Sequence, residues 1–366
     1  MFLALREIRH SKLRFVLITG VIVMVSCLVF ILSGLANGLS AGNKQAIDAM
    51  PIDAMVISDG SDYLLDRSAV AAGDAKTIAG MDGIDRADPI GISSANIRKD
   101  GSTEILGVSF FGVMPDGMIQ PHIDKGESWQ HHDRGIVIDE TLTEKGVGLG
   151  DTIVTEPGDV ELEVVGITSG QSYRLAPTVF MSLDLWQQLQ PTQEGAVPDA
   201  VSAILVRGDR DAIETIPATV DSTMIASKGQ IISNIPGESE QNGTLLLIQV
   251  FLVVIAAGII ASFFYIMTLQ KMPELGVMKA IGTKTSYLAR NMIAQVLVLA
   301  VVGVLLGISI ADTVALIIGN AVPYSISTQR MVIFGGLLLL VAIGGTVLSL
   351  FRIARVDPLD AINKAG

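Results

Sequence analysis

Few residues in this chain have the types and spacing that chemistry requires. His131 and His132 stand directly before Asp133, a composition that suggests a metal site. Adjacent side chains in a strand or loop point apart, so this trio does not favour a shared metal ion. No Ser/His/Asp set and no carboxylate pair has the spacing of an active site, and the phosphate-binding pattern G-x-x-x-x-G-K-[ST] does not occur. The sequence therefore predicts that the chain is not an enzyme and does not bind ATP through a P-loop.

A short basic segment offers a different kind of function. It reads KMPELGVMKAIGTK over residues 271–284, between two strongly apolar stretches. Pro273 suits the first turn of a helix, and Gly282 can end one. Three apolar residues recur at i, i+3 and i+6 and would form one stripe: Leu275, Met278 and Ile281. We expect a short amphipathic helix that either lies among lipid headgroups or docks another protein.

Four apolar stretches must position these residues. Half of the residues are hydrophobic and the mean hydropathy is +0.54, too apolar for an ordinary soluble domain. Each stretch is long enough to cross ~30 Å of hydrocarbon as a helix. The predicted transmembrane helices cover residues 15–37, 243–269, 291–319 and 331–351. A signal peptide is the alternative for the first stretch, but its length and the three later stretches disfavour that interpretation.

Charged residues predict how these helices are oriented. Residues 1–14, 270–290 and 352–366 together carry 11 Lys and Arg against four Asp and Glu. The positive-inside rule places these segments in the cytoplasm: an amphipathic N-terminal helix, the coupling helix loop and the tail. Residues 38–242 and the loop 320–330 then lie outside a plasma or inner membrane. Within the membrane, Asp312 is either a functional carboxylate or a pairing group.

The segment from residue 38 to residue 242 is predicted to be a folded outer domain. From Ser40 to Asn242 it has 13 Lys and Arg against 32 Asp and Glu, which excludes nucleic acid as an obvious partner. Its composition predicts an α/β domain with a strand bias. The expected strands are 54–58, 135–140, 151–155, 161–167, 176–182 and 201–208. The expected helices are 68–81, 182–189 with Ser182 as N-cap, and 210–220.

Pairs of glycines occur within the apolar stretches. Gly34 and Gly38 are four residues apart, as are Gly303 and Gly307. This spacing lets membrane helices approach closely, and the first pair could serve a dimer seam. Ordinary glycine enrichment in membrane helices is the alternative.

Several segments resemble one transporter family. KMPELGVMKAIGTKTSYLARNMIAQ (271–295) is similar to the coupling segment of MacB/FtsX/LolC-type (type VII) ABC transporter permeases, with the pattern E-[LI]-G-V-x-[KR]-A-[LI]-G. The tail RIARVDPLDAINKAG (352–366) resembles the C-terminal segment of proteins in that family, and the start ALREIRHSKLRFVLI (4–18) resembles their N-terminal amphipathic helix. NKQAIDAMPIDAMVIS (43–58), PTVFMS (177–182) and IPGESEQNGTLLLIQ (235–249) are most similar to haem-exporter permeases of the HrtB-like kind.

The resemblance implies a fold and a set of partners. The fold would be four transmembrane helices with a large extracytoplasmic α/β domain between helices 1 and 2. It implies a permease homodimer in the membrane lipid with two copies of a separate cytoplasmic ATPase, which binds the ATP and moves the outer domains. The expected ATPase contacts are Glu274, Leu275, Met278, Lys279 and Ile281. No bound cofactor is expected.

Haem is the substrate that the resemblance implies. Haem is flat and apolar, carries two propionates and needs axial iron ligands, which His, Met, Tyr or a carboxylate can provide. Glu238 lies in a Pro-Gly-Glu hinge, and Tyr173 on a loop precedes Arg174, which could meet a propionate. Other candidates are Met24, Met50 and Tyr265, with Glu238 and Met24 as possible iron ligands; each also has an ordinary packing or hinge interpretation.

Two other functions stay open at this level. One is extraction of another amphipathic compound, such as a lipid, a peptide or a drug. The other is an FtsX-like signal relay that controls an outer hydrolase and transports nothing. A relay predicts an outer partner protein and no dependence on Glu238 or Tyr173, whereas a pump predicts ATPase stimulation by its cargo.

Overall fold

The chain divides into two compact units in the computed structural model, residues 39–242 and residues 1–38 with 243–366. The structure describes residues 12–190, 197, 199–270, 277–278, 281–318, 324–325 and 328–354. Most of the predicted N-terminal helix and the tail beyond residue 354 lie outside these ranges. The predicted fold class is confirmed, because four helices are long and apolar enough to cross a membrane and an α/β domain lies between the first and second.

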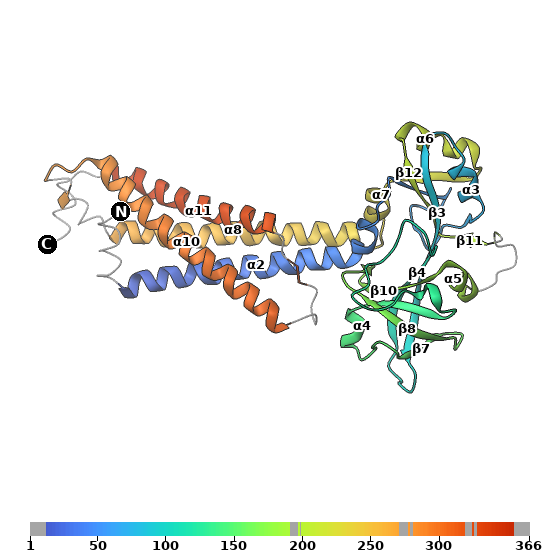
Figure 1. The fold of residues 1–366 in the computed structure, drawn as a ribbon. Helices are drawn as coiled ribbons and strands as arrows, with labels where there is room; N and C mark the ends of the chain where they lie inside the picture. Colours follow the sequence, from blue (N-terminus) through green and yellow to red (C-terminus); the bar gives the residue numbers. More distant parts are fainter. Residues whose placement is uncertain are drawn as a thin grey trace. The chain divides into compact units, whose positions relative to one another are not determined.

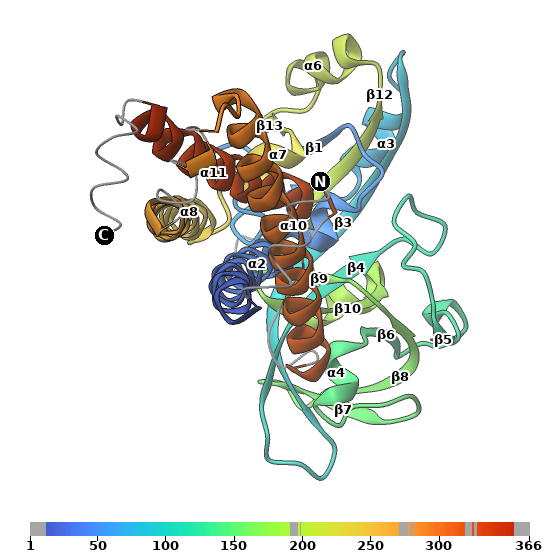
Figure 2. The same cartoon turned by 90° about the vertical axis from the view of Figure 1, so that its left-hand side faces the viewer.

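Among its described residues, the helical unit contains four long helices (Figure 1). They are α2 (Lys12–Asp48), α8 (Glu238–Gln270), α10 (Thr285–Ile318) and α11 (Thr328–Ala354). Figure 2 shows α2 and α8 close to end-on, with α10 and α11 beside them. The helix α2 continues past residue 37 without a break, and α8 begins at Glu238, before the predicted start at residue 243. Both helices are therefore longer than their apolar stretches.

Glycines bring the backbones of these helices close together. A Cβ at Gly303 would lie 2.6 Å from Ile22 Cγ2, and one at Gly307 would lie 2.6 Å from Ser26 Cβ, so both glycines of α10 face α2. Gly34, for which the sequence suggested a dimer seam, is covered by the ring of Tyr324 from the same chain. These glycines serve packing within one chain.

The α/β unit contains an 11-stranded sheet and a separate pair of short strands. The sheet order is β13-β1-β12-β3-β4-β10-β6-β8-β5, with β7 against β3 and β8, and β9 against β10; β11 pairs with β2. The strands are β1 (Ala54–Ser58), β2 (Val70–Ala71), β3 (Ile84–Lys99), β4 (Leu106–Val113), β5 (Lys125–Gly126), β6 (Gly135–Asp139), β7 (Thr152–Glu156), β8 (Glu161–Thr168), β9 (Ser172–Tyr173), β10 (Ala176–Ser182), β11 (Ala200–Val201), β12 (Ala203–Gly208) and β13 (Thr223–Ala226).

The strand β3 joins the two halves of this sheet. Its residues 84–90 pair with β12, and its residues 91–97 pair with β4. Neither β3 nor β4 was among the predicted strands, although the two strands pair along most of their length. Residues of β3 contribute to two apolar cores, one containing Ile97 and Phe110 and the other containing Ile90 and Phe111.

Short helices cover parts of this sheet. They are α3 (Asp74–Ala79), α4 (Thr141–Glu144), α5 (Leu183–Leu189), α6 (Arg210–Thr219) and α7 (Lys228–Ser233), with a 3-10 turn η1 (Trp129–His131). The predicted helix 182–189 is confirmed with its cap, because the Ser182 hydroxyl accepts the Leu185 N–H at 3.2 Å. The predicted helix 68–81 is partly wrong: Val70 and Ala71 form β2, and only 74–79 is helical.

Candidate functional site

The Glu238 carboxylate is buried at the start of α8. Glu238 is 1% exposed. It directly follows Gly237, whose φ of +83° is a backbone conformation that favours glycine. Glu238 Oε1 accepts hydrogen bonds from Asn242 Nδ2 at 2.8 Å and from Ser40 Oγ at 3.2 Å, and Oε2 accepts one from Asn43 Nδ2. All three donors are neutral. A carboxylate in the first helical turn is also favoured by the helix dipole.

Asn43 connects this carboxylate to a second predicted candidate. Its side-chain amide donates to Glu238, and its backbone carbonyl accepts the Arg174 N–H at 3.0 Å. The neighbouring Gly42 carbonyl accepts the Leu175 N–H at 3.1 Å. The structure thus brings Glu238 and the Tyr173-Arg174 segment together through the end of α2. Asn43 and Ser40 were not among the predicted site residues, although they form a polar pair three residues apart directly after an apolar stretch.

Arg174 and Leu175 form the tight turn between β9 and β10. Tyr173 pairs with Ala176, and both turn residues have positive φ, +56° for Arg174 and +60° for Leu175. Asn-Gly and Gly-Gly suit such a turn, whereas most other residues with a Cβ are disfavoured there by roughly 1–2 kcal/mol. The Arg174 guanidinium donates to Asp66 Oδ2 at 2.6 Å. A propionate at Arg174 would therefore compete with Asp66.

Tyr173 is part of a core, not of an exposed loop. It is 4% exposed in β9 and packs edge-on against Phe111 with ring centroids 5.8 Å apart. Burial raises the pKa of its phenol to about 12, partly offset by the charge of Arg174. The phenol therefore stays protonated at neutral pH, which disfavours Tyr173 as a tyrosinate ligand. We assign it a packing role.

The three remaining substrate candidates have different surroundings. Met50 is 3% exposed within the same core as Tyr173, and its carbonyl accepts a hydrogen bond from Lys228 Nζ at 3.0 Å. Met24 on α2 and Tyr265 on α8 belong to the helical unit. Met24 is 74% exposed and Tyr265 is half-buried.

The predicted coupling segment is described only in part. Glu274, Leu275 and Lys279 lie outside the described residues. Met278 packs against Leu288 and Met292 of α10, whereas Ile281 is 77% exposed. The two described members of the predicted apolar stripe thus have different surroundings. Gly282 has φ +96° and follows the Ile281 N–H bond to Val277 O at 3.1 Å, as expected where a helix ends.

The other polar candidates do not assemble a metal centre. His132 Nε2 lies 3.0 Å from Glu127 Oε1, and His131 ends the 3-10 turn η1. Within the described ranges, no three His, Cys, Asp or Glu side chains could hold one metal ion. Asp312 is half-buried on α10.

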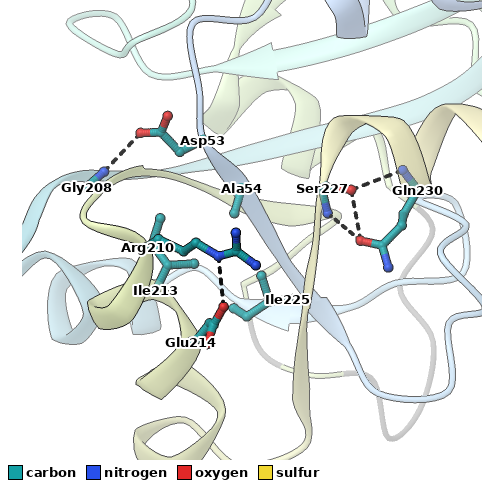
Figure 3. Close-up of a pocket in the computed structure, with 9 residues that line it drawn as sticks. All are labelled: Asp53, Ala54, Gly208, Arg210, Ile213, Glu214, Ile225, Ser227 and Gln230. Atoms are coloured by element: carbon teal, nitrogen blue, oxygen red, sulfur yellow. Dashed lines mark hydrogen bonds and ion pairs between the residues drawn. The ribbon is translucent and has the colours of Figure 1, made fainter.

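The α/β unit also contains a surface pocket of about 650 Å³ (Figure 3). Its lining residues are Asp53, Ala54, Gly208, Arg210, Ile213, Glu214, Ile225, Ser227 and Gln230. Arg210 pairs with Glu214 along α6, and the Ser227 hydroxyl and Gln230 amide form a capping box at α7. The dashed lines in Figure 3 show that these polar side chains bind one another, and that Asp53 accepts the Gly208 N–H.

Known proteins similar to this chain are permeases. Residues 246–358 match the family described as FtsX-like permease C-terminal. A Staphylococcus epidermidis protein, provisionally named hemin transport system permease protein HrtB, is 27% identical over 368 residues, covering 99% of each chain. An uncharacterized ABC transporter permease of Mycobacterium tuberculosis is 25% identical over 363 residues, again covering 99% of each. The solved periplasmic region of MacB from Actinobacillus actinomycetemcomitans aligns with 51% of this chain and 93% of its own, at 15% identity and a TM-score of 0.37.

Proposed function

We propose that this chain, which matches the FtsX-like permease C-terminal family over residues 246–358 and is similar to ABC transporter permeases over nearly its whole length, is the membrane subunit of a haem efflux pump driven by a separate ATPase. The Staphylococcus relatives that align over nearly the whole chain carry a hemin-transport name. The chain itself supplies no phosphate-binding loop, so ATP is bound by the partner. Four helices are long and apolar enough to cross a membrane, which supports a role as a membrane subunit.

The observation that carries the haem assignment is the Glu238 carboxylate. It is buried, and its three hydrogen-bond donors are all neutral, so its charge remains available to a cationic centre. Ferric iron in haem accepts an anionic oxygen as an axial ligand. Iron binding at one oxygen would leave the amides of Asn242 or Asn43 on the other, as is usual for ligating carboxylates. Because Glu238 is covered in this conformation, cargo reaches it when the ends of α2 and α8 separate.

The partners follow from the transporter type. An ABC permease works with an ATPase, and we propose two copies of that ATPase on a permease homodimer. The segment with Glu274, Leu275, Met278, Lys279 and Ile281 would contact the ATPase from the cytoplasmic side. In this arrangement the acidic α/β unit is extracytoplasmic and both termini are cytoplasmic. The Ile281 side chain is 77% exposed, which supports its role in such a contact.

Haem titration of the purified permease–ATPase complex tests this proposal. We expect a saturable Soret band for the wild-type complex and at least a tenfold weaker affinity for Glu238→Gln, since loss of a ligand or its support typically costs 10–100-fold. Glu240→Gln is the matched control, because Glu240 is an exposed acid in the same helical turn. Tyr173→Phe should leave the band unchanged, because its phenol stays protonated and buried.

The outcomes separate haem from the other functions. A saturable band that Glu238→Gln does not weaken would move the binding site away from α8. Absence of any saturable band would refute the haem assignment. Stimulation of ATPase activity by a lipid, peptide or drug would then identify a different cargo, whereas capture of an outer hydrolase would favour a signal relay.

A further inference from the structure

We propose that Asn43 is a positioning residue that couples the Glu238 carboxylate to the Arg174-Leu175 turn of the α/β unit. The inference rests on the proposed function only in naming haem as the group that perturbs the carboxylate. The coupling itself concerns contacts within residues 39–242 and can be measured without any cargo.

The turn needs external support to keep its conformation. Arg174 and Leu175 both have positive φ, and neither is the glycine or asparagine that this region favours. A strained backbone persists only where its surroundings hold it, and such strain concentrates at functional sites. A loss of support should therefore let the turn relax.

The support comes mainly from the end of α2. The N–H groups of Arg174 and Leu175 donate to the carbonyls of Asn43 and Gly42 at 3.0 and 3.1 Å. Leu175 also lies over Gly42, where an added Cβ would be 3.0 Å from Leu175 Cδ2. Arg174 is tied separately to Asp66. These two helix carbonyls thus hold the backbone of the turn against the end of α2.

Asn43 is placed to move with the carboxylate. Its side-chain amide contacts Glu238 Oε2 and lies 3.4 Å from Gln241 Oε1, while its carbonyl holds Arg174. Among the described contacts of the turn, Asn43 is the one residue that also touches Glu238. A ligand that draws the carboxylate away pulls on the Asn43 amide, and the carbonyl of the same residue tilts with it. Occupancy at Glu238 is thereby transmitted to the turn between β9 and β10.

Hydrogen exchange of the peptide covering residues 170–178 measures this coupling in the permease–ATPase complex without haem. Losing a hydrogen bond to a charged group should raise exchange of the Arg174 and Leu175 amides about tenfold in Asn43→Ala, and similarly in Glu238→Gln. The double variant should exchange no faster than either single variant, because both remove one interaction. Glu240→Gln should match wild type. Unchanged exchange in Glu238→Gln, or multiplied effects in the double variant, would overturn the coupling.

A charge swap, which exchanges the amide and the carboxylate between positions 43 and 238, separates a loss of coupling from a general loss of stability in Asn43→Ala or Glu238→Gln. Asn43→Asp faces the carboxylate of Glu238 and should loosen the turn at neutral pH by like-charge repulsion. Combining it with Glu238→Gln restores an amide–carboxylate bond of reversed direction and should return the exchange to near the wild-type rate. A swap variant that exchanges as fast as Asn43→Asp alone would refute the positioning role. Exchange of the peptide covering β3 reports whether each variant is folded.

Adding haem distinguishes this inference from the proposed function. Haem should accelerate exchange of residues 170–178 in the wild-type complex and not in Asn43→Ala. If haem has no effect while the cargo-free coupling and the charge swap behave as expected, the haem assignment fails and the positioning role of Asn43 stands. If haem binds at Glu238 but the cargo-free coupling is absent, the opposite holds.

Discussion

The two units of this chain expose different kinds of side chain. In the α/β unit, large apolar side chains such as Phe111 are fully enclosed, and ion pairs such as Lys99–Asp151 lie nearer the surface. In the helical unit, apolar side chains such as Leu340, 67% exposed, face outward, while Ser26 is completely buried beside a glycine. Lipid is as apolar as leucine, so the bundle gains from close backbone contact and not from hiding apolar surface. The comparison teaches that each unit depends on a different kind of contact.

The largest expected effect tests the core of the α/β unit. The Trp186 indole fills the space above Gly91 and Gly112, where any Cβ would collide with it, and its Nε1 donates to Ser93 Oγ at 2.9 Å. Trp186→Ala should lower the free energy of unfolding of this unit by about 3–5 kcal/mol. Urea titration of the full chain in detergent, followed by proteolysis of residues 39–242, measures it.

Ser93→Ala is the matched control for this prediction. It removes the hydroxyl that accepts hydrogen bonds from Trp186 Nε1 at 2.9 Å and Gln190 Nε2 at 3.3 Å, and should cost about 1–2 kcal/mol. Equal effects of the two substitutions would show that the polar contact, and not indole packing, holds the unit.

The next largest effect is expected in the helical unit, where the same glycine-to-leucine substitution is compared at two positions. Leucine at Gly307 would meet Ser26 Cβ at 2.6 Å and the Cys27 backbone nitrogen at 3.0 Å, so Gly307→Leu should destabilise the bundle by roughly 1–3 kcal/mol. Gly258 on α8 has nothing within 4 Å of an added Cβ, so Gly258→Leu should be tolerated. Thermal unfolding of the purified permease, read by size exclusion after heating, compares them. Similar melting temperatures for both variants would contradict packing by backbone approach.

The smallest effect tests the surface charges of the α/β unit. The Lys99 ammonium, and next the Gly148 N–H, hold the pKa of Asp151 below its ordinary value of 3.8. A lowered folded-state pKa means that this contact stabilises the fold above that ordinary value and is lost as the pH falls through the folded-state value. Asp151→Asn should therefore cost at most about 1 kcal/mol at pH 7 and nothing in strong acid. A cost that does not change with pH would rule out the ion pair as its source.

Features that depend on neighbouring residues could be predicted from the sequence. The four candidate membrane helices follow from long, strongly apolar stretches, and α5 follows from Ser182 at its N-cap. Strands with partners far along the chain were harder to predict. Val70 and Ala71 have the local appearance of a helix, but they form β2 because β11 pairs with them. Pairing with a distant strand thus overrides the local secondary-structure propensity of these residues.

The sequence by itself determined that this is a four-helix membrane protein with an acidic inserted domain, and it pointed to Glu238 and to the Tyr173-Arg174 segment. Only the tertiary structure decided what those residues can do. It buried Tyr173 beside Phe111, engaged Arg174 with Asp66, and surrounded Glu238 with neutral donors. Ser40 and Asn43 are 198 and 195 residues from Glu238 along the chain. Hydrophobic periodicity reports only local order, whereas burial and hydrogen-bond partners depend on contacts between distant segments.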